Sequence, residues 1–130
     1  MIIDSSAVVA ILLGEREASA MADAMEEAPI CRISAVNYVE AAVVIDIRRE
    51  PILSRGLDDL LHQTQTIVEA VTSAQARLAR EAYRDFGKGR HRAGLNLGDC
   101  FAYALAKDKG ERLLFKGDDL RRTDVEAAEY

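Results

Sequence analysis

The sequence predicts one α/β domain, spanning residues 1–130, with a mainly parallel sheet that helices cover on both faces. Three observations predict it. Short strand-like runs alternate with helical patterns, and this alternation is typical of parallel sheets. A chain of 130 residues fits a single domain with a substantial core. No internal repeat, low-complexity tract or linker divides the chain.

The first half of the chain is expected to form two strands and three helices. Gly14 and Pro29 follow the first two helical patterns, and Ser34 is a suitable N-cap for the third. The pair Glu50-Pro51 closes that third helix. In chain order the expected elements are a strand at Met1–Asp4, a helix at Ala7–Leu13, a helix at Arg16–Ala28, a strand at Ile30–Ile33 and a helix at Ala35–Arg49.

The second half is expected to add three helices and two or three strands. A leucine-rich side marks its first helix, Thr72-Ser73 caps the second, and Gly110 ends the third. In chain order the expected elements are a helix at Leu53–Gln63, a strand at Thr66–Val71, a helix at Ala74–Phe86, a basic connection at Gly87–Gly94, a helix at Asn96–Lys109, a strand at Leu113–Phe115 and a short fifth strand at Val125.

The composition excludes several classes of protein. Apolar residues make up 49% and charged residues 30%, which is typical of globular proteins. No apolar stretch approaches the roughly 18 residues that a membrane span needs, and no secretory signal is visible. We therefore expect a cytoplasmic protein without a membrane contact. Cys31 and Cys100 form no metal-binding pattern and are expected to be buried, reduced thiols.

The net charge of −5 argues against non-specific binding of nucleic acid through a uniformly basic surface. It does not exclude a nucleic-acid substrate, because metal ions held by carboxylates change the local field at a site. An acidic surface also suits a partner that brings positive charge.

The most informative residues are acids in apolar surroundings: Asp4, Glu40, Asp99 and the pair Asp118-Asp119. Asp4 and the pair directly follow strand candidates, and active sites of parallel sheets gather beyond the carboxyl ends of the strands. Asp99 opens a helix that would aim its carboxylate at the same edge. Carboxylates that meet in one pocket repel each other and need a shared cation, usually a hard divalent metal. The pattern predicts a metal-dependent nuclease.

Each of these acids also has a purely structural explanation. Asp4 can cap the helix that follows it. Asp99 lies three residues after Asn96, a spacing similar to a capping box. Asp118 and Asp119 can be turn residues, because Gly-Asp-Asp is common after a strand. No single acid indicates a metal site strongly, but the placement of all of them together favours one.

Glu40 lies in the middle of a strongly apolar helical pattern. A buried, isolated carboxylate is costly and requires a cation or a proton. The alternative is that Glu40 marks the exposed side of a helix that is apolar all round. On a helix Glu40 would share its side with Val36, Val43, Val44 and Ile47.

Four segments resemble the PIN-domain ribonucleases, and most closely the VapC-type toxins of type II toxin–antitoxin (VapBC) pairs. The block Leu95–Ala106 (LNLGDCFAYALA) is the most specific of them. The others are Met1–Ser6 (MIIDSS), Ser34–Glu40 (SAVNYVE) and Leu113–Leu120 (LLFKGDDL), with Thr123-Asp124 beyond it. The resemblance covers the whole chain.

The resemblance implies a PIN-like three-layer α/β/α sandwich with a central sheet of four to five strands. It also implies a Mg²⁺-dependent endoribonuclease toxin, with Mn²⁺ as a substitute, that a VapB-type antitoxin neutralises. The acidic ligands of the family map onto Asp4, Glu40 and Asp99. Many members carry Thr-x-Asp after the last strand, where this chain has Lys116-Gly117-Asp118-Asp119. Either Asp118 or Asp119 is therefore the fourth acid.

In this hypothesis Asp4 and Asp99 bind metal directly, Glu40 binds it or orients the attacking water, and Asp118 or Asp119 holds a second ion. The basic residues most suited to contact RNA phosphates are Lys88, Arg90, His91, Arg92 and Lys116, although Lys88–Arg92 can equally be a solvated loop.

The resemblance further implies two partners. An antitoxin often presents an Arg to the carboxylates, and the apolar helices before Pro51 are candidates for the groove that its amphipathic segment occupies. A homodimer is also expected, because PIN toxins commonly dimerise.

Two rival protein classes fit the acids less well. A receiver domain needs an acidic pair after the first strand and an Asp after the third, whereas this chain has Ser5-Ser6 and Glu69-Ala70-Val71. A haloacid-dehalogenase-like phosphatase needs Asp-x-Asp, which Ser6 breaks. The remaining alternative is a non-catalytic receiver-like or binding domain with an acidic pocket.

Overall fold

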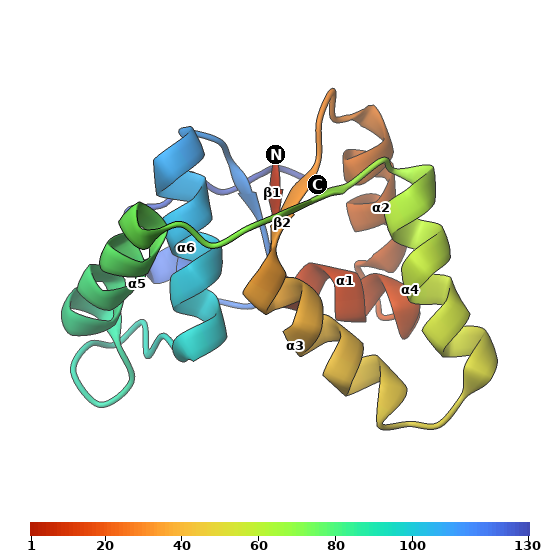
Figure 1. Ribbon diagram of the computed structural model, residues 1–130, viewed down its shortest axis with the longest axis horizontal. Coiled ribbons are helices and arrows are strands. Elements are labelled where there is room, and N and C mark those ends of the chain that lie inside the picture. The colour runs from red at the N-terminus through yellow and green to blue at the C-terminus, as the bar shows by residue number, and fades with distance from the viewer.

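The computed structural model describes residues 1–130 as a four-stranded parallel sheet between two layers of helices (Figure 1). The strands are β1 (Ile2–Ile3), β2 (Arg32–Ser34), β3 (Ile67–Glu69) and β4 (Leu113–Leu114), in the order β3-β2-β1-β4. The helices are α1 (Ser5–Leu12), α2 (Ala18–Glu27), α3 (Ala35–Asp46), α4 (Pro51–Gln63), α5 (Ser73–Phe86) and α6 (Leu97–Lys109), with a 3₁₀ turn at Leu120–Arg122. The predicted fold class is confirmed.

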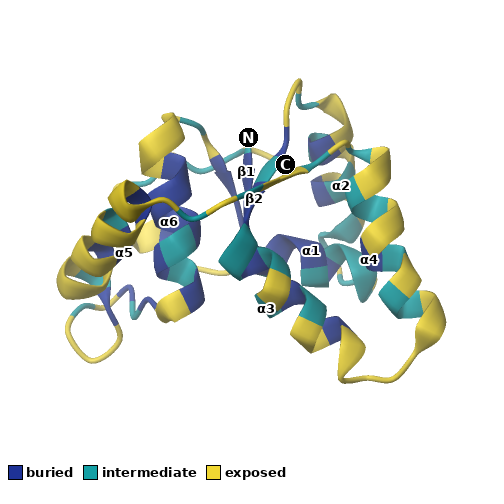
Figure 2. Ribbon diagram, in the orientation of Figure 1, coloured by how far each residue is buried: buried dark blue, intermediate teal, exposed yellow.

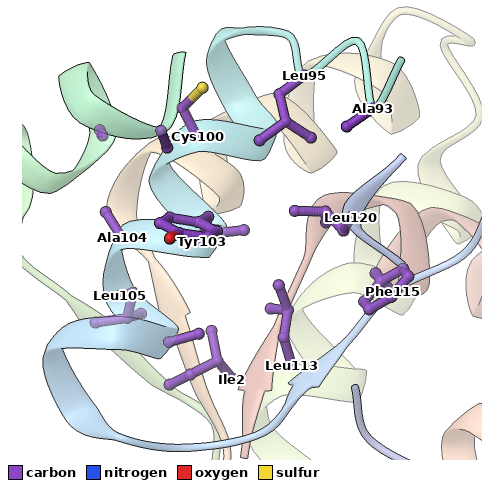
Figure 3. Packing of buried hydrophobic residues seen from close by; sticks show 14 residues of the cluster. Ile2, Ala93, Leu95, Cys100, Tyr103, Ala104, Leu105, Leu113, Phe115 and Leu120 are labelled. Atoms are coloured by element: carbon purple, nitrogen blue, oxygen red, sulfur yellow. The ribbon is translucent and has the colours of Figure 1, made fainter. Parts of the chain in front are cut away.

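The two shortest strands separate two hydrophobic cores. Successive side chains of a strand point to opposite faces, so Ile2 and Leu113 enter the core with α5 and α6, whereas Ile3 and Leu114 enter the core with α1 to α4. All four side chains are fully buried. Figure 2 shows buried residues on β1 and on the inner sides of the helices, and Figure 3 shows Ile2 and Leu113 on the side of the sheet that α6 covers with Leu105.

Most helix boundaries follow the capping residues that the sequence predicts. Asp4, Ser34 and Thr72 each accept a hydrogen bond from a backbone N–H in the first turn of the helix that follows. Asn96 and Asp99 form both bonds of a capping box at α6. Gly110 ends α6 with a left-handed φ of 64°.

Most expected bounds lie within two residues of those in the structure, and two expected elements differ by more. The third helix ends at Asp46 and not at Arg49, whose φ of 56° is incompatible with a continuing helix. Pro51 is the first residue of α4. The backbone N–H at this position has no partner within a helix, so proline removes no hydrogen bond there. Val125 forms no fifth strand. Only an isolated bridge joins Leu113 to Ala127, because β4 has just two residues to pair.

Both cysteine thiols are free and buried, as expected. None of the helices is both long and apolar enough to cross a lipid bilayer.

Candidate metal centre

Asp4 lies at the carboxyl end of β1, where the strand ends and α1 begins. Its backbone N–H donates to Leu114 O (2.9 Å), which fixes it beside β4, and its Oδ2 accepts from Ser6 N (2.9 Å). The side chain is 2% exposed. Burial raises the pKa of Asp4 above its ordinary value, the hydrogen bonds from Ser6 oppose that rise, and the charge of Glu40 adds to it. Asp4 is thus both an N-cap and a buried acid.

Glu40 lies on α3, one turn beyond Asn37, and is half-buried. Ser5 Oγ donates a hydrogen bond to Glu40 Oε1. The carboxylate also packs against Gly98 of α6, because a Cβ atom on Gly98 would lie 2.6 Å from Glu40 Cδ. These contacts join Glu40 to both α1 and α6.

The expectation that Glu40 shares a buried side of its helix is wrong. Val43 and Ile47 are 58% and 76% exposed, and the side of α3 that faces the core carries Asn37, Ala41 and Ile45. The sequence of this helix is apolar on all sides and so does not indicate which side is buried. Tertiary contacts alone decide its orientation. Glu40 lies at the border between the buried and exposed sides.

Asp99 lies in the first turn of α6, where its Oδ2 accepts from Asn96 N (3.0 Å). Burial is the largest cause that raises the pKa of Asp99 from 3.8 to about 6. The hydrogen bond from Asn96 opposes the rise, and the charges of Asp4, Asp119 and Glu40 add to it. Asp99 therefore feels the negative charge of three other carboxylates from three different segments.

Asp118 and Asp119 differ in their surroundings, although both are exposed. Asp119 is the one whose charge acts on Asp99. The Asp118 side chain is 72% exposed and lies 4.0 Å from a guanidinium nitrogen of Arg122. Of the pair, Asp119 is the acid whose charge contributes to the raised pKa of Asp99.

Asn37 is a buried polar residue at this edge that sequence reasoning missed. It is 0% exposed, and its Nδ2 donates to Gly98 O (3.0 Å) and, over a longer distance, to Asp4 Oδ1 (3.4 Å). Its Oδ1 is buried without a hydrogen-bond partner. The available signal was its spacing, because Asn37 precedes Glu40 by three residues and so lies near it on the helix.

No basic side chain neutralises these acids. The nine ion pairs of the structure include none of Asp4, Glu40, Asp99 or Asp119. Lys116 is adjacent in sequence to the acidic turn, but its ammonium group pairs with Glu15 and Glu17. Its backbone N–H donates to Ser6 Oγ (2.9 Å), which ties the segment after β4 to α1.

The donor set fits a hard divalent cation in its chemistry. The polar side chains around these acids offer oxygen ligands, namely the carboxylates themselves and the Ser5 hydroxyl. In this arrangement no three His, Cys, Asp or Glu side chains converge closely enough to hold a metal ion directly. A cation here would be held by fewer direct carboxylate ligands together with its own waters, a habit typical of Mg²⁺.

The residues expected to contact RNA are divided between two places. Lys88, Arg90 and Arg92 are exposed in the connection between α5 and α6. His91 is half-buried there, and its Nδ1 accepts from Ala93 N (3.0 Å). A second group of arginines, which sequence reasoning missed, lies on the exposed side of α5 at helical spacing: Arg77, Arg80 and Arg84.

The comparisons with known proteins identify the family. The model of the PIN domain family matches residues 1–126. The chain belongs to the PIN-domain family. Among its PIN-domain relatives, ribonuclease VapC28 of Mycobacterium tuberculosis is 52% identical over 129 residues, which cover 98% of this chain and 97% of that one. Ribonuclease VapC of Mycolicibacterium smegmatis is 50% identical over 127 residues, which cover 98% of both chains.

Two solved structures share the PIN-domain fold at low sequence identity. A structure of Mycobacterium tuberculosis VapC20, described as a Sarcin-Ricin loop cleaving toxin, has a TM-score of 0.77, is 16% identical and covers 98% of this chain and 97% of that one. A toxin–antitoxin complex from Klebsiella pneumoniae has a TM-score of 0.74, is 15% identical and covers 99% of this chain and 97% of that one. The predicted membership among VapC-type PIN-domain ribonucleases is confirmed.

Proposed function

We propose that this PIN-domain protein is a Mg²⁺-dependent endoribonuclease toxin that hydrolyses RNA phosphodiester bonds in the cytoplasm. The observation that carries the proposal is the negative charge around Asp99. Asp4, Glu40 and Asp119 all act on its ionisation, and no Lys or Arg compensates them. A site of this kind favours a divalent cation, and Mn²⁺ would substitute for Mg²⁺.

Each acid has a distinct role in the proposal. Asp4 and Asp99 are direct ligands, since both are substantially buried and held by backbone hydrogen bonds that leave lone pairs free. Glu40 binds metal or orients water, with Ser5 fixing its Oε1. Asp119, in preference to Asp118, is the fourth acid. When bound, a divalent cation would supply charge neutralisation at the phosphoryl oxygens and would lower the pKa of a coordinated water.

The basic residues hold the RNA and take no part in the chemistry. Lys88, Arg90 and Arg92 are free to contact phosphates because none of their side chains is ion-paired within the protein. Lys116 is a weaker candidate, since binding RNA would compete with its pairing to Glu15 and Glu17.

A cognate antitoxin of the VapB type would neutralise the enzyme by bringing positive charge to the same acids. An Arg side chain matches a carboxylate with two parallel hydrogen bonds, and the site offers several carboxylates without an internal basic partner. The presence of an antitoxin in the complex from Klebsiella pneumoniae is consistent with this assignment.

A homodimer is the second assembly that we propose, through the exposed apolar side of α3. Val39, Val43 and Ile47 lie four residues apart on this helix and are 55%, 58% and 76% exposed. Apolar side chains gathered in this way mark an interaction surface. A second copy of the chain would cover it with the same surface, as two-fold dimers do.

The nuclease proposal is tested with purified protein, a structured RNA and Mg²⁺ or Mn²⁺. We expect cleavage that excess chelator abolishes and added Mn²⁺ restores, and a loss of at least about 100-fold for Asp99→Asn. The circular dichroism spectrum of that variant should match the wild type. Full cleavage in excess chelator would contradict the proposal.

A further inference from the structure

Asn37 is the only buried side chain that bonds to two of the segments that carry the acids. It lies on α3 with Glu40, its Nδ2 donates to Asp4 Oδ1 at the end of β1 (3.4 Å), and the same group donates to Gly98 O (3.0 Å), the residue before Asp99. Its side chain is 0% exposed, so water does not compete for these contacts.

The orientation of the amide follows from its neighbours. Asp4 Oδ1 and Gly98 O are both acceptors, so the nitrogen of Asn37 must face them and the oxygen must face elsewhere. That oxygen is buried without a donor from the protein. The oxygen therefore makes no hydrogen bond to the acids, and the nitrogen alone joins Asp4 to the start of α6.

We propose that Asn37 is a positioning residue of the metal centre. Its Nδ2 holds Asp4 and the start of α6 at a fixed separation from α3. The inference rests on the proposed nuclease function. It assigns to Asn37 the kind of outer role that orients direct ligands and whose loss typically weakens metal binding about 10–100-fold.

A purely structural role would give a different result, and Gln75 provides the matched control. Gln75 is also a buried amide, 3% exposed, and its Nε2 donates to the carboxylate of Asp108 (3.0 Å) between α5 and α6. Asn37→Leu and Gln75→Leu each remove a buried amide and one hydrogen bond that it donates to a carboxylate. Only the first of these carboxylates belongs to the proposed metal centre.

The experiment measures Mn²⁺ binding by electron paramagnetic resonance to the wild type, N37L and Q75L, at a temperature where circular dichroism shows each protein folded. We expect N37L to bind Mn²⁺ at least about 10-fold more weakly and Q75L to bind it as the wild type does. Cleavage by N37L should recover as Mn²⁺ is raised, because the defect is in affinity.

Other outcomes separate the two proposals. If N37L keeps the wild-type Mn²⁺ affinity, Asn37 is only structural and the inference is wrong, while the nuclease proposal stands. If the wild type binds no Mn²⁺, the nuclease proposal fails and the inference fails with it. Should N37L not fold, the smaller variant Asn37→Ser decides in the same assay: weaker binding supports the inference, and unchanged binding overturns it.

Discussion

Gly98 leaves the space that the carboxylate of Glu40 occupies. A Cβ atom at position 98 would approach Glu40 Cδ to 2.6 Å and Oε1 to 2.7 Å. The glycine belongs to the first turn of α6 and its φ is not left-handed, so its backbone alone does not require glycine. The requirement comes from the close approach of α3 to α6.

Gly98→Ala should therefore impair the site more than the fold. The added methyl group meets the end of a flexible side chain, which can move away, and alanine favours the helix by up to about 1 kcal/mol. We expect thermal stability close to that of the wild type and cleavage reduced by about 10-fold or more, since the displaced Glu40 no longer occupies its position. The control is Gly56→Ala in α4, where the nearest atom would be Leu12 Cδ2 at 3.4 Å. Equal cleavage by both variants and the wild type would show that the position of Glu40 is unimportant.

The two acids after β4 should behave differently when each is neutralised. Asp119 acts on the ionisation of Asp99, whereas Asp118 lies beside Arg122 and is largely exposed. We expect Asp119→Asn to lower cleavage by about 10-fold or more and Asp118→Asn to change it little. Initial rates at saturating Mg²⁺ measure the difference, and the reverse order would assign the fourth acid to Asp118.

The metal-free protein should lose stability as the pH rises from about 4 to about 6. The pKa of Asp99 is raised to about 6 in the folded state, mainly by burial, so the folded protein binds the proton more tightly than the unfolded chain does. The stabilisation is complete below the unfolded pKa and is lost as the pH rises through the folded pKa. Asp99→Asn, which stays neutral, should gain stability relative to the wild type over this range.

Thermal unfolding in chelator, repeated across the pH range, measures the gap between Asp99→Asn and the wild type. Mg²⁺ or Mn²⁺ should narrow the gap at pH 7, because the cation stabilises the ionised wild-type site. A gap that does not change with pH would indicate that Asp99 has an ordinary pKa.

The connection between α5 and α6 should contribute to RNA affinity through charge alone. In a catalytically inactive Asp99→Asn background, the triple variant of Lys88, Arg90 and Arg92 to Ala should weaken RNA binding and reduce its dependence on salt, by about one unit of slope per lost phosphate contact. Fluorescence anisotropy at several KCl concentrations measures this slope. The matched comparison replaces Arg77, Arg80 and Arg84 of α5. If only this second variant reduces the slope, the RNA follows α5.

The exposed side of α3 should mediate self-association. Ile47→Asp places a charge on a side chain that is 76% exposed, and we expect it to convert a dimer to a monomer in light scattering after size-exclusion chromatography. Ile67→Asp, on the exposed edge strand β3 where Ile67 is 45% exposed, is the control and should leave the mass unchanged. A wild-type monomer at micromolar concentration would contradict the proposal.

Particular residues explain how far the sequence predicted this structure. Asp4, Ser34 and the Asn96–Asp99 pair were predictable because caps act over a few residues and leave a local pattern. The orientation of α3 was not predictable, since a helix that is apolar all round gives no local indication of which side is buried. Asn37 was missed for the same reason. Its role depends on Asp4 and Gly98, which lie 33 and 61 residues away in the chain.

The shortness of β1 has a consequence for how the chain tolerates insertions. Ile2 belongs to one core and Ile3 to the other, and Asp4 follows immediately. One extra residue between Ile2 and Asp4 would move either an isoleucine into the wrong core or the carboxylate away from its neighbours. The burial of Ile2 and Ile3 in their two cores therefore also fixes the position of Asp4.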